Sequence, residues 1–291
     1  MNQKILQDFK DKYYSIDGQF LVELAKNDCI AWVRSYFEEN ASEDNIAVVG
    51  LSGGKDSTVT AALCVEALGS SRVLGVLMPN GYQEDLIYAT HVAQALRIQS
   101  ITVNISDPVF DLYKIFENAN YNHVSPFGYN IRFKAVGTEV SNLVAPAKFE
   151  LNNLAKNNIS IRMRMIVLYA IAQSVGGRVA NTSNLSEDWV GYATRYGDGA
   201  GDFAPIANFT VTEVKQLGKS LGLSSQLINK IPVDGVCGLT DEENLGFTYE
   251  ELDNWIRFGV QSENQQLINS KHLYSLFKMS MMPKFGGDPF N

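Results

Sequence analysis

The sequence predicts an α/β fold in which helices cover a parallel β-sheet. Two units of β-strand, turn and α-helix follow one another between residues 46 and 96, and a third apolar strand follows at 100–105. Short apolar strands that alternate with helices are typical of a parallel sheet that is buried on both faces. The chain has 291 residues, of which 45% are hydrophobic and 19% charged, so enough apolar side chains are present for a large core.

The first half of the chain supplies most of this pattern. Residues 19–39 repeat apolar positions at helical spacing and predict a helix that leads into the core. Residues 46–51 are a continuous apolar run, which predicts a buried strand, and the helix that follows is expected to end at Gly69. The second unit comprises a strand at 73–78 and a helix at about 84–96. A parallel sheet with helical crossovers is therefore expected.

The second half is predicted to be mainly helical. Residues 106–150 contain several prolines and glycines, so irregular structure with short helices is expected there. A helix is predicted at 159–175 and a strand at 178–182, followed by a loop at 188–205 that is rich in glycine. Further helices are predicted at 212–221, near 226, at 249–258 and at 264–277.

No linker or low-complexity block divides the sequence. The chain is therefore predicted to form a single domain over residues 1–291, with N-terminal helices up to about residue 42 and C-terminal helices from about residue 245 packed on it.

Composition argues against several classes of protein. The net charge is −8 and no basic stripe stands out along the sequence, so no nucleic-acid partner is expected. No stretch approaches the roughly 20 apolar residues that span a membrane, so a cytoplasmic enzyme without a membrane partner is expected. The three histidines lack metal-ligand spacing, which argues against histidine-bound zinc and a Ser-His-Asp triad. Cys29, Cys64 and Cys237 form no CxxC pair and are expected to be free thiols.

The most informative motif is Ser52–Ser57, Ser-Gly-Gly-Lys-Asp-Ser, between a predicted strand and a predicted helix. Adjacent glycines let backbone N–H groups approach a polyanion, and the helix N-terminus adds a favourable dipole, so phosphate is the expected ligand. The spacing matches neither a Walker A loop nor a Rossmann dinucleotide loop. Asp56 would repel phosphate unless a hard cation such as Mg²⁺ lay between them, which favours a metal–nucleotide complex. The alternative is a capped glycine turn without a ligand.

This loop resembles the Ser-Gly-Gly-x-Asp-Ser loop of the N-type ATP pyrophosphatases, which cleave ATP between the α- and β-phosphates and transfer AMP. Other stretches resemble one family of that superfamily, the ammonia-dependent NAD synthetases. They are Arg162–Met165 with Tyr169, Asn181–Glu187, Gly191–Asp202 and Thr240–Asp253. The spacing agrees as well, because Thr182 stands twenty residues after Arg162 and five before Glu187. The resemblance covers about residues 46–258.

The resemblance implies a Rossmann-like sheet with flanking helices, of the adenine-nucleotide alpha hydrolase type, and a role for each matching residue. The expected catalytic residues are Asp56, Glu187 and Asp202, and Asp56 and Glu187 are also the expected Mg²⁺ ligands. The expected ATP-binding residues are Ser52, Gly53, Gly54, Lys55, Asp56, Ser57 and Thr182. The residues expected to bind the substrate deamido-NAD are Arg162, Arg195, Asp202 and Lys278.

The implied reaction is the amidation of nicotinic acid adenine dinucleotide (deamido-NAD) to NAD. Its carboxylate attacks the α-phosphate of ATP, giving an adenylate and pyrophosphate, and ammonia then displaces AMP. Carboxylates that place Mg²⁺ and arginines that pair with phosphates suit this chemistry. The resemblance also implies a homodimer, with the apolar helix at 159–176 as a candidate interface. No glutamine-hydrolysing module is expected beside this domain, so ammonia would arrive free or from a partner.

Three positions depart from the family pattern. Val211 stands where the family has a lysine near the nucleotide, and Val233 stands where the family has a Ser or Thr. Phe277 begins the segment that corresponds to the family's His-Lys-Arg sequence, of which only Lys278 is kept. Lys55 is the candidate to supply the cation missing at Val211. Two alternatives therefore stay open: an amidoligase of the same superfamily that acts on another carboxylate, and a nucleotide-binding relative without activity. Tyr192, Tyr196 and Phe203 are left without a predicted role.

Overall fold

The computed structural model describes residues 3–42, 44–83, 86–119, 134–135, 138–139, 150–229 and 240–280. In this part of the chain the main sheet has four parallel strands in the order β3-β2-β1-β6. Their bounds are β1 Ala47–Gly50, β2 Val73–Leu77, β3 Gln99–Thr102 and β6 Arg178–Ala180. Two short strands, β4 (Lys134–Ala135) and β5 (Thr138–Glu139), form a separate antiparallel pair. The predicted α/β class with a parallel sheet is confirmed.

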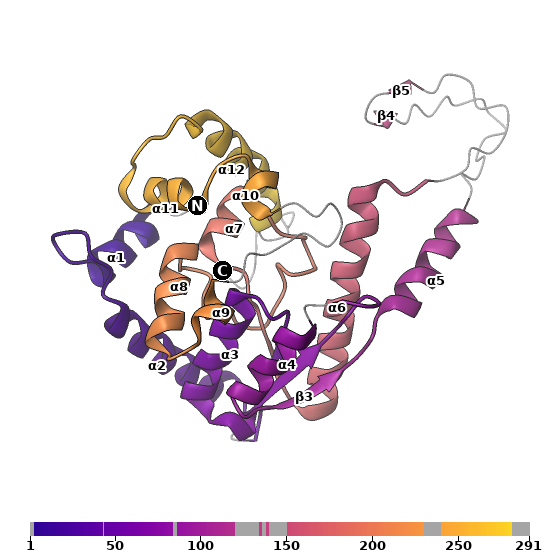
Figure 1. Cartoon of the computed structure of the whole chain (residues 1–291), viewed down its shortest axis with the longest axis horizontal. Helices are drawn as coiled ribbons and strands as arrows, with labels where there is room; N and C mark the ends of the chain where they lie inside the picture. The colour runs from indigo at the N-terminus through magenta and orange to yellow at the C-terminus, as the bar shows by residue number, and fades with distance from the viewer. Residues whose placement is uncertain are drawn as a thin grey trace, which may run out of the picture.

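Helices make up most of the remaining described chain (Figure 1). The N-terminal half contains α1 (Gln3–Tyr13), α2 (Val22–Asn40), α3 (Lys55–Leu68), the 3-10 helix η1 (Ser70–Arg72), α4 (Leu86–Ala95) and α5 (Ser106–Glu117). The C-terminal half contains α6 (Asn153–Val175), α7 (Leu185–Val190), α8 (Val211–Ser220), α9 (Ser225–Ile228), α10 (Asp241–Leu245), α11 (Tyr249–Phe258) and α12 (Gln265–Met279). No helix among the described residues combines the length and apolar character needed to cross a bilayer.

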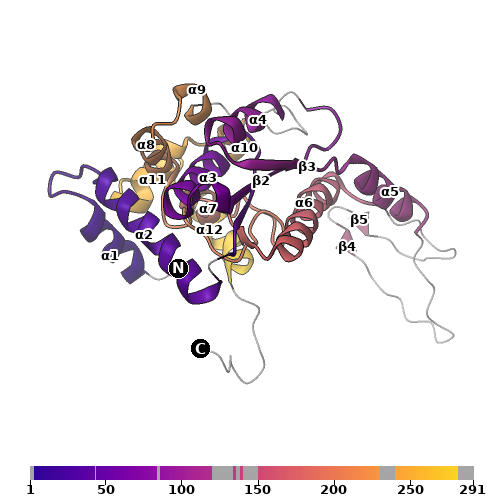
Figure 2. The same ribbon diagram turned by 90° about the horizontal axis from the view of Figure 1, so that it is seen from below.

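The central strand is buried on both faces. Ala47 and Val49 of β1 pack into one apolar cluster with residues of α2, α3 and α4, whereas Val48 between them packs into another with residues of α5 and α6. Alternate side chains of a strand point to opposite faces, so a continuous apolar run supplies both layers. Figure 2 shows the sheet between α3 and α4 on one side and α5 and α6 on the other.

The strand order places a crevice beside β1. The chain passes outward from β1 to β2 and β3, then returns through α6 to β6 on the other side of β1. The loops that follow β1 and β6 therefore diverge at the carboxyl edge of the sheet, which is where open α/β sheets bind ligands. These two loops, together with the first turns of the helices that follow them, contain Ser52–Ser57 and Asn181–Glu187.

The terminal helices pack on one end of this core. Phe20, Phe209 and Leu217 belong to an apolar cluster that joins the N-terminal segment and α2 to α3 and α8. A buried ion pair between Arg257 of α11 and Glu213 of α8, 2.7 Å long, lies beside it, and Tyr14 donates a hydrogen bond to the same carboxylate. The ion pair thereby holds α11 against α8.

Most predicted elements are present, with three differences. The segment predicted to be irregular begins with α5, a helix of twelve residues, whose Pro108 lies in the first turn, where a helix needs no backbone N–H. Helix α6 begins at Asn153 because the Asn152 side chain accepts a hydrogen bond from the Ala155 N–H. The glycine-rich loop is preceded by α7, too short to leave a periodic pattern.

Candidate active site

The phosphate loop runs from the end of β1 to the first turn of α3. Gly53 has a φ of +76°, and a Cβ built on it would lie 2.7 Å from the Cβ of Tyr88, so both conformation and space require glycine. The Ser52 hydroxyl lies 3.1 Å from the Ser57 hydroxyl and accepts a hydrogen bond from the Gly54 N–H. The two serines therefore hold the loop around the N-terminus of α3, where unpaired N–H groups favour an anion.

Asp56 and Glu187 come together although 131 residues separate them in sequence (187 − 56). Asn184 connects their loops: its side-chain oxygen accepts from the Glu187 N–H at 3.0 Å, capping α7, and its side-chain nitrogen donates to Asp56 at 3.0 Å. Lys55 Nζ donates to Asp56 Oδ2 at 2.9 Å and lies 4.0 Å from Glu187 Oε1. The two carboxylates predicted from separate loops thus share one ammonium group.

The charges in this cluster influence one another strongly. Burial, reinforced by the Asp56 carboxylate, raises the pKa of Glu187 well above its usual value. Burial alone would lower the pKa of Lys55, but Asp56 and Glu187 outweigh it and raise that pKa, so Lys55 stays an ammonium ion. Burial also raises the pKa of Asp241, a neighbouring carboxyl group at the start of α10. The cluster therefore contains more acidic than basic groups, and a further cation would stabilise it.

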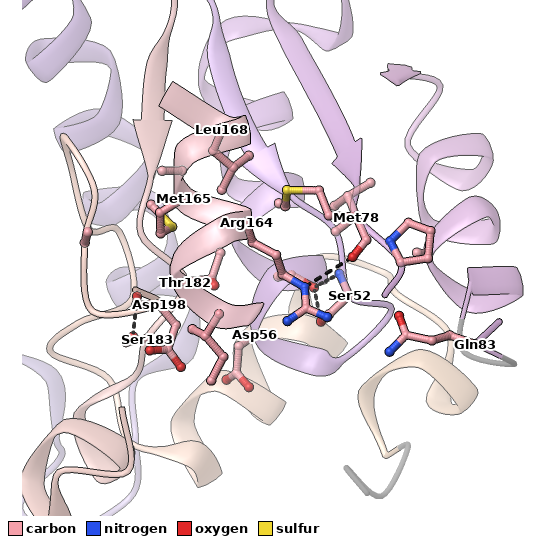
Figure 3. Close-up of a pocket in the computed structure, with 18 of the residues that line it drawn as sticks. Ser52, Asp56, Met78, Gln83, Arg164, Met165, Leu168, Thr182, Ser183 and Asp198 are labelled. Carbon is pink, nitrogen blue, oxygen red and sulfur yellow. Dashed lines mark hydrogen bonds between the residues drawn. The ribbon is translucent and has the colours of Figure 1, made fainter. Parts of the chain in front are cut away.

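A pocket of about 420 Å³ opens beside these residues, a volume typical of small-molecule sites. Predicted ATP-binding residues form part of its wall, namely Ser52, Asp56, Ser57 and Thr182. Figure 3 shows Met78, Met165 and Leu168 on another part of the wall, so the pocket has both a polar and an apolar side. Three of the six predicted loop residues and Thr182 are therefore brought together at one cavity, whereas Gly53, Gly54 and Lys55 do not line it.

Arg164 is a pocket residue for which the sequence predicted no role. Its Nε donates to the Met78 carbonyl at 3.2 Å, and the guanidinium reaches toward Ser52 (Figure 3). Burial lowers the pKa of this guanidinium, and the Asp198 carboxylate, which lines the same pocket, opposes that shift only in part. The segment Arg162–Met165, on which the family resemblance rests, includes this arginine. Residues two apart on a helix point in directions about 200° apart, so Arg162 and Arg164 cannot face the same cavity. Arg162 instead is exposed and donates to the Arg195 carbonyl at 3.2 Å.

The other predicted substrate residues lie outside the pocket wall. Arg195 donates to the carbonyls of Phe277 and Ser280, and Lys278 donates to the Gly191 carbonyl at 2.9 Å. These contacts connect the glycine-rich loop to the end of α12. Asp202 accepts a hydrogen bond from the Val179 N–H at 2.7 Å and is otherwise exposed at the edge of β6. Arg162, Arg195 and Lys278 are thus gathered at the glycine-rich loop, whereas Asp202 binds the backbone of β6.

The three positions that depart from the family pattern lie in different surroundings. Val211 is buried at the start of α8 in an apolar cluster with Leu185 and Tyr249. The Tyr249 ring also faces Lys55, whose Nζ lies 5.7 Å from the ring centre. Phe277 is 63% exposed on α12, and Val233 lies outside the described residues, as does Cys237. Cys29 and Cys64 are free and buried.

The donor set at the pocket suits Mg²⁺ bound together with a nucleotide. In the described ranges, no group of three or more His, Cys, Asp or Glu side chains is placed to hold a metal ion. Mg²⁺ is commonly bound by one or two carboxylates together with phosphate oxygens and water. Asp56 and Glu187, which face a common cation beside a phosphate loop, provide such a pair.

A parallel sheet with a phosphate loop at its switch point defines this chain as a nucleotide-binding α/β protein. A family model described as NAD synthase matches residues 25–282. The chain therefore belongs to the NAD synthase family, whose ammonia-dependent relatives are ligases that form C–N bonds.

Individual relatives agree with this placement. The chain is 37% identical over 257 residues to the NH(3)-dependent NAD(+) synthetase of Methanocaldococcus jannaschii, a match that covers 87% of each chain. The structure of NMN synthetase from Francisella tularensis matches with a TM-score of 0.75 and 26% identity, covering 91% of this chain and 99% of that one. The fold is also that of the NH3-dependent NAD synthetase from Campylobacter jejuni, with a TM-score of 0.65, 23% identity, and coverage of 90% and 98%.

Proposed function

We propose that this chain converts deamido-NAD to NAD with ammonia and ATP, through an adenylate, and releases AMP and pyrophosphate. The observation that carries the proposal is the meeting of Asp56 and Glu187 beside the phosphate loop, since the chemistry needs a metal–nucleotide complex at this point. Family membership over residues 25–282 supports the same reaction. The chain therefore acts as an amide-forming ligase.

The residues of the pocket divide the work of adenylation. The N–H groups at the start of α3 and the hydroxyls of Ser52 and Ser57 bind phosphate oxygens. Asp56 and Glu187 would hold Mg²⁺, which supplies charge neutralisation for the leaving pyrophosphate. Arg164 adds a cation from the opposite wall, and Thr182 adds a hydroxyl. The protein thus positions the reactants and stabilises charge, without a covalent bond to the enzyme.

The nicotinate substrate is proposed to enter from the side of the glycine-rich loop. Arg162 and Arg195 lie next to each other there and suit the phosphates of a dinucleotide. Lys278, which holds the backbone of this loop at Gly191, and Asp202, which binds the backbone of β6, complete the proposed site. Once the adenylate has formed, ammonia adds to its activated carbonyl carbon, loses a proton and expels AMP, leaving the amide.

A mononucleotide is the second candidate substrate. Among the structures described above, the NMN synthetase superimposes with the higher TM-score, and it is matched over nearly its whole length. An enzyme that formed nicotinamide mononucleotide would amidate nicotinic acid mononucleotide by the same two steps. The phosphate loop and carboxylate pair would be unchanged, and only the substrate contacts would differ.

The deciding experiment compares the two substrates directly. The purified protein is incubated with Mg-ATP, ammonium and either deamido-NAD or nicotinic acid mononucleotide, and the amide, AMP and pyrophosphate are followed together. Equal amounts of all three products with deamido-NAD are expected, and the ratio of kcat/KM for the two acids assigns the substrate. Asp56→Asn is the control and should lose activity with both. AMP release with neither acid would contradict the proposal.

A homodimer in the cytoplasm is also proposed. Phe110, Ile115, Leu154 and Ile166 are each 57–68% exposed on α5 and α6, an apolar surface of the kind that pairs with another subunit. The unpaired thiols Cys29 and Cys64 suit a reducing compartment.

The terminal helices pack on the core through extensive apolar contacts, which supports a single domain.

A further inference from the structure

Lys55 occupies an unusual position for a lysine. It is the first residue of α3, where the helix dipole disfavours a cation, and its side chain is only 5% exposed. Burial of an ammonium group is costly unless it is paired. Here the pairing groups are Asp56 at 2.9 Å and Glu187 at 4.0 Å, the same two carboxylates that are proposed to hold the metal.

The ammonium group and a metal ion would compete for this pair of carboxylates. A Mg²⁺ bound by both would need oxygen atoms at about 2.0–2.1 Å, with no other cation between them. The Nζ of Lys55 lies 2.9 Å from Asp56 Oδ2 and 4.0 Å from Glu187 Oε1, so an ammonium group already faces both carboxylates. Lysine has a flexible four-carbon stem and a compact charge, so its ammonium can move while the backbone of α3 stays in place.

We propose that Lys55 is an internal counter-ion that neutralises Asp56 and Glu187 in the nucleotide-free enzyme, and that it moves onto the ATP phosphates when Mg-ATP brings the metal. The proposal rests on the assignment of Mg²⁺ to these carboxylates in the proposed function. It explains why a buried ammonium group lies at the start of α3, beside two carboxyl groups. It also predicts that the free enzyme binds a divalent cation poorly and the ATP complex binds it well.

Metal binding without nucleotide provides the test. Free Mn²⁺ is titrated by electron paramagnetic resonance into the wild-type chain and into Lys55→Met, which removes the charge and keeps the stem. Removal of the competing ammonium should tighten Mn²⁺ binding at least tenfold, and Lys55→Arg, which keeps a positive charge, should bind as weakly as wild type. Lys26→Met is the matched control, because Lys26 pairs with Glu23 on α2, away from the pocket. It should bind Mn²⁺ like wild type.

The second step of the proposal is tested with a non-hydrolysable ATP analogue at saturating Mn²⁺. Lys55→Met should bind the analogue about tenfold more weakly than wild type, because the phosphates lose a cation. Should Lys55→Met fail to fold, Lys55→Gln, which can still donate to Asp56, takes its place with the same expectations. Unchanged or weaker Mn²⁺ binding in the folded neutral variant overturns the counter-ion role, whatever the amidation assay gives. Tighter binding in the variant, together with no amidation of deamido-NAD by the wild-type chain, supports that role and overturns the substrate assignment.

Discussion

At the scale of the residue, the site depends on which side chain of a close pair faces the pocket. Arg162 and Arg164 stand two positions apart on α6, yet Arg164 lines the pocket and Arg162 contacts the backbone of Arg195. The two guanidinium groups therefore belong to different parts of the proposed substrate complex. Substitution of one arginine should therefore weaken mainly the binding of ATP, and substitution of the other should weaken mainly the binding of the acid substrate.

Arg164→Met should raise the KM for ATP by about 10- to 100-fold, because loss of a charge-assisted hydrogen bond costs about 1.5–3 kcal/mol. The KM for deamido-NAD should change much less. Arg162→Met is the matched control and should show the opposite pattern. Steady-state kinetics with each substrate varied in turn measures both effects. Equal increases in both KM values for Arg164→Met would contradict the assignment to the nucleotide.

The buried thiols give a prediction about pH. Burial raises the pKa of Cys29 to about 12 and raises the pKa of Cys64 as well. The thiolate is the reactive form, so at pH 8 only about one Cys29 in 10⁴ is reactive, a fraction that grows as the pH rises toward 12. Native protein treated with iodoacetamide at pH 8 should stay unmodified at both positions by peptide mass spectrometry. Unfolded protein in urea should react at both. Equal labelling in the two states would show that the thiols are accessible.

At the scale of the element, α11 holds the starts of two other helices in place. The Asp253 carboxylate is 5% exposed and accepts hydrogen bonds from the Ser186 hydroxyl and from the N–H and hydroxyl of Thr212. Ser186 in turn accepts from the Val211 N–H at 3.0 Å. Because Glu187 follows Ser186, this C-terminal carboxylate fixes the backbone next to the proposed metal ligand.

Asp253→Ala should reduce the free energy of unfolding by about 2–4 kcal/mol, because it leaves the buried Ser186 hydroxyl and the N–H and hydroxyl of Thr212 without their acceptor. Urea denaturation with a two-state fit measures the change. Asp111→Ala provides the control, since Asp111 is exposed on α5 and pairs with Lys114 at its surface, and it should cost less than about 0.5 kcal/mol. A loss as small as that of the control would mean that water replaces the carboxylate.

At the scale of the whole molecule, α5 and α6 lie together on one side of the sheet, at the end opposite α1 (Figure 1). Helix α6 packs against β1 and β6 with one face, through Met165 and Leu168, and leaves Ile166 63% exposed. A second subunit on this surface would cover these apolar side chains, which contribute about 25 cal/mol for each Å² removed from water.

Ile166→Glu should convert the proposed dimer to a monomer, because burial of an unpaired carboxylate in an interface is strongly unfavourable. Size-exclusion chromatography with light scattering gives the mass, 32.2 kDa for one chain. Ile5→Glu, at an exposed isoleucine of α1, should leave the mass of the assembly unchanged. A wild-type chain that elutes as a monomer would remove the basis for the interface.

The sequence by itself determined the features that depend on neighbouring residues. The bounds of α11 follow from the capping box of Thr248 and Glu251 at its start and Gly259 at its end. The position of the phosphate loop could be predicted because the glycines and serines that form it all lie within six consecutive residues. The family resemblance likewise depended on short sequence motifs and on their spacing along the chain.

Only the tertiary structure decided which distant groups meet. The crossover from β3 to β6 places Asn184 where it bridges Asp56 and Glu187, and α6 is rotated so that Arg164 rather than Arg162 faces the cavity. The approach of Lys55 to both carboxylates was equally outside the reach of sequence patterns. Local conformation follows from propensities and caps within a few residues. The approach of side chains more than a hundred residues apart instead follows from strand order and from the packing of both faces of the sheet.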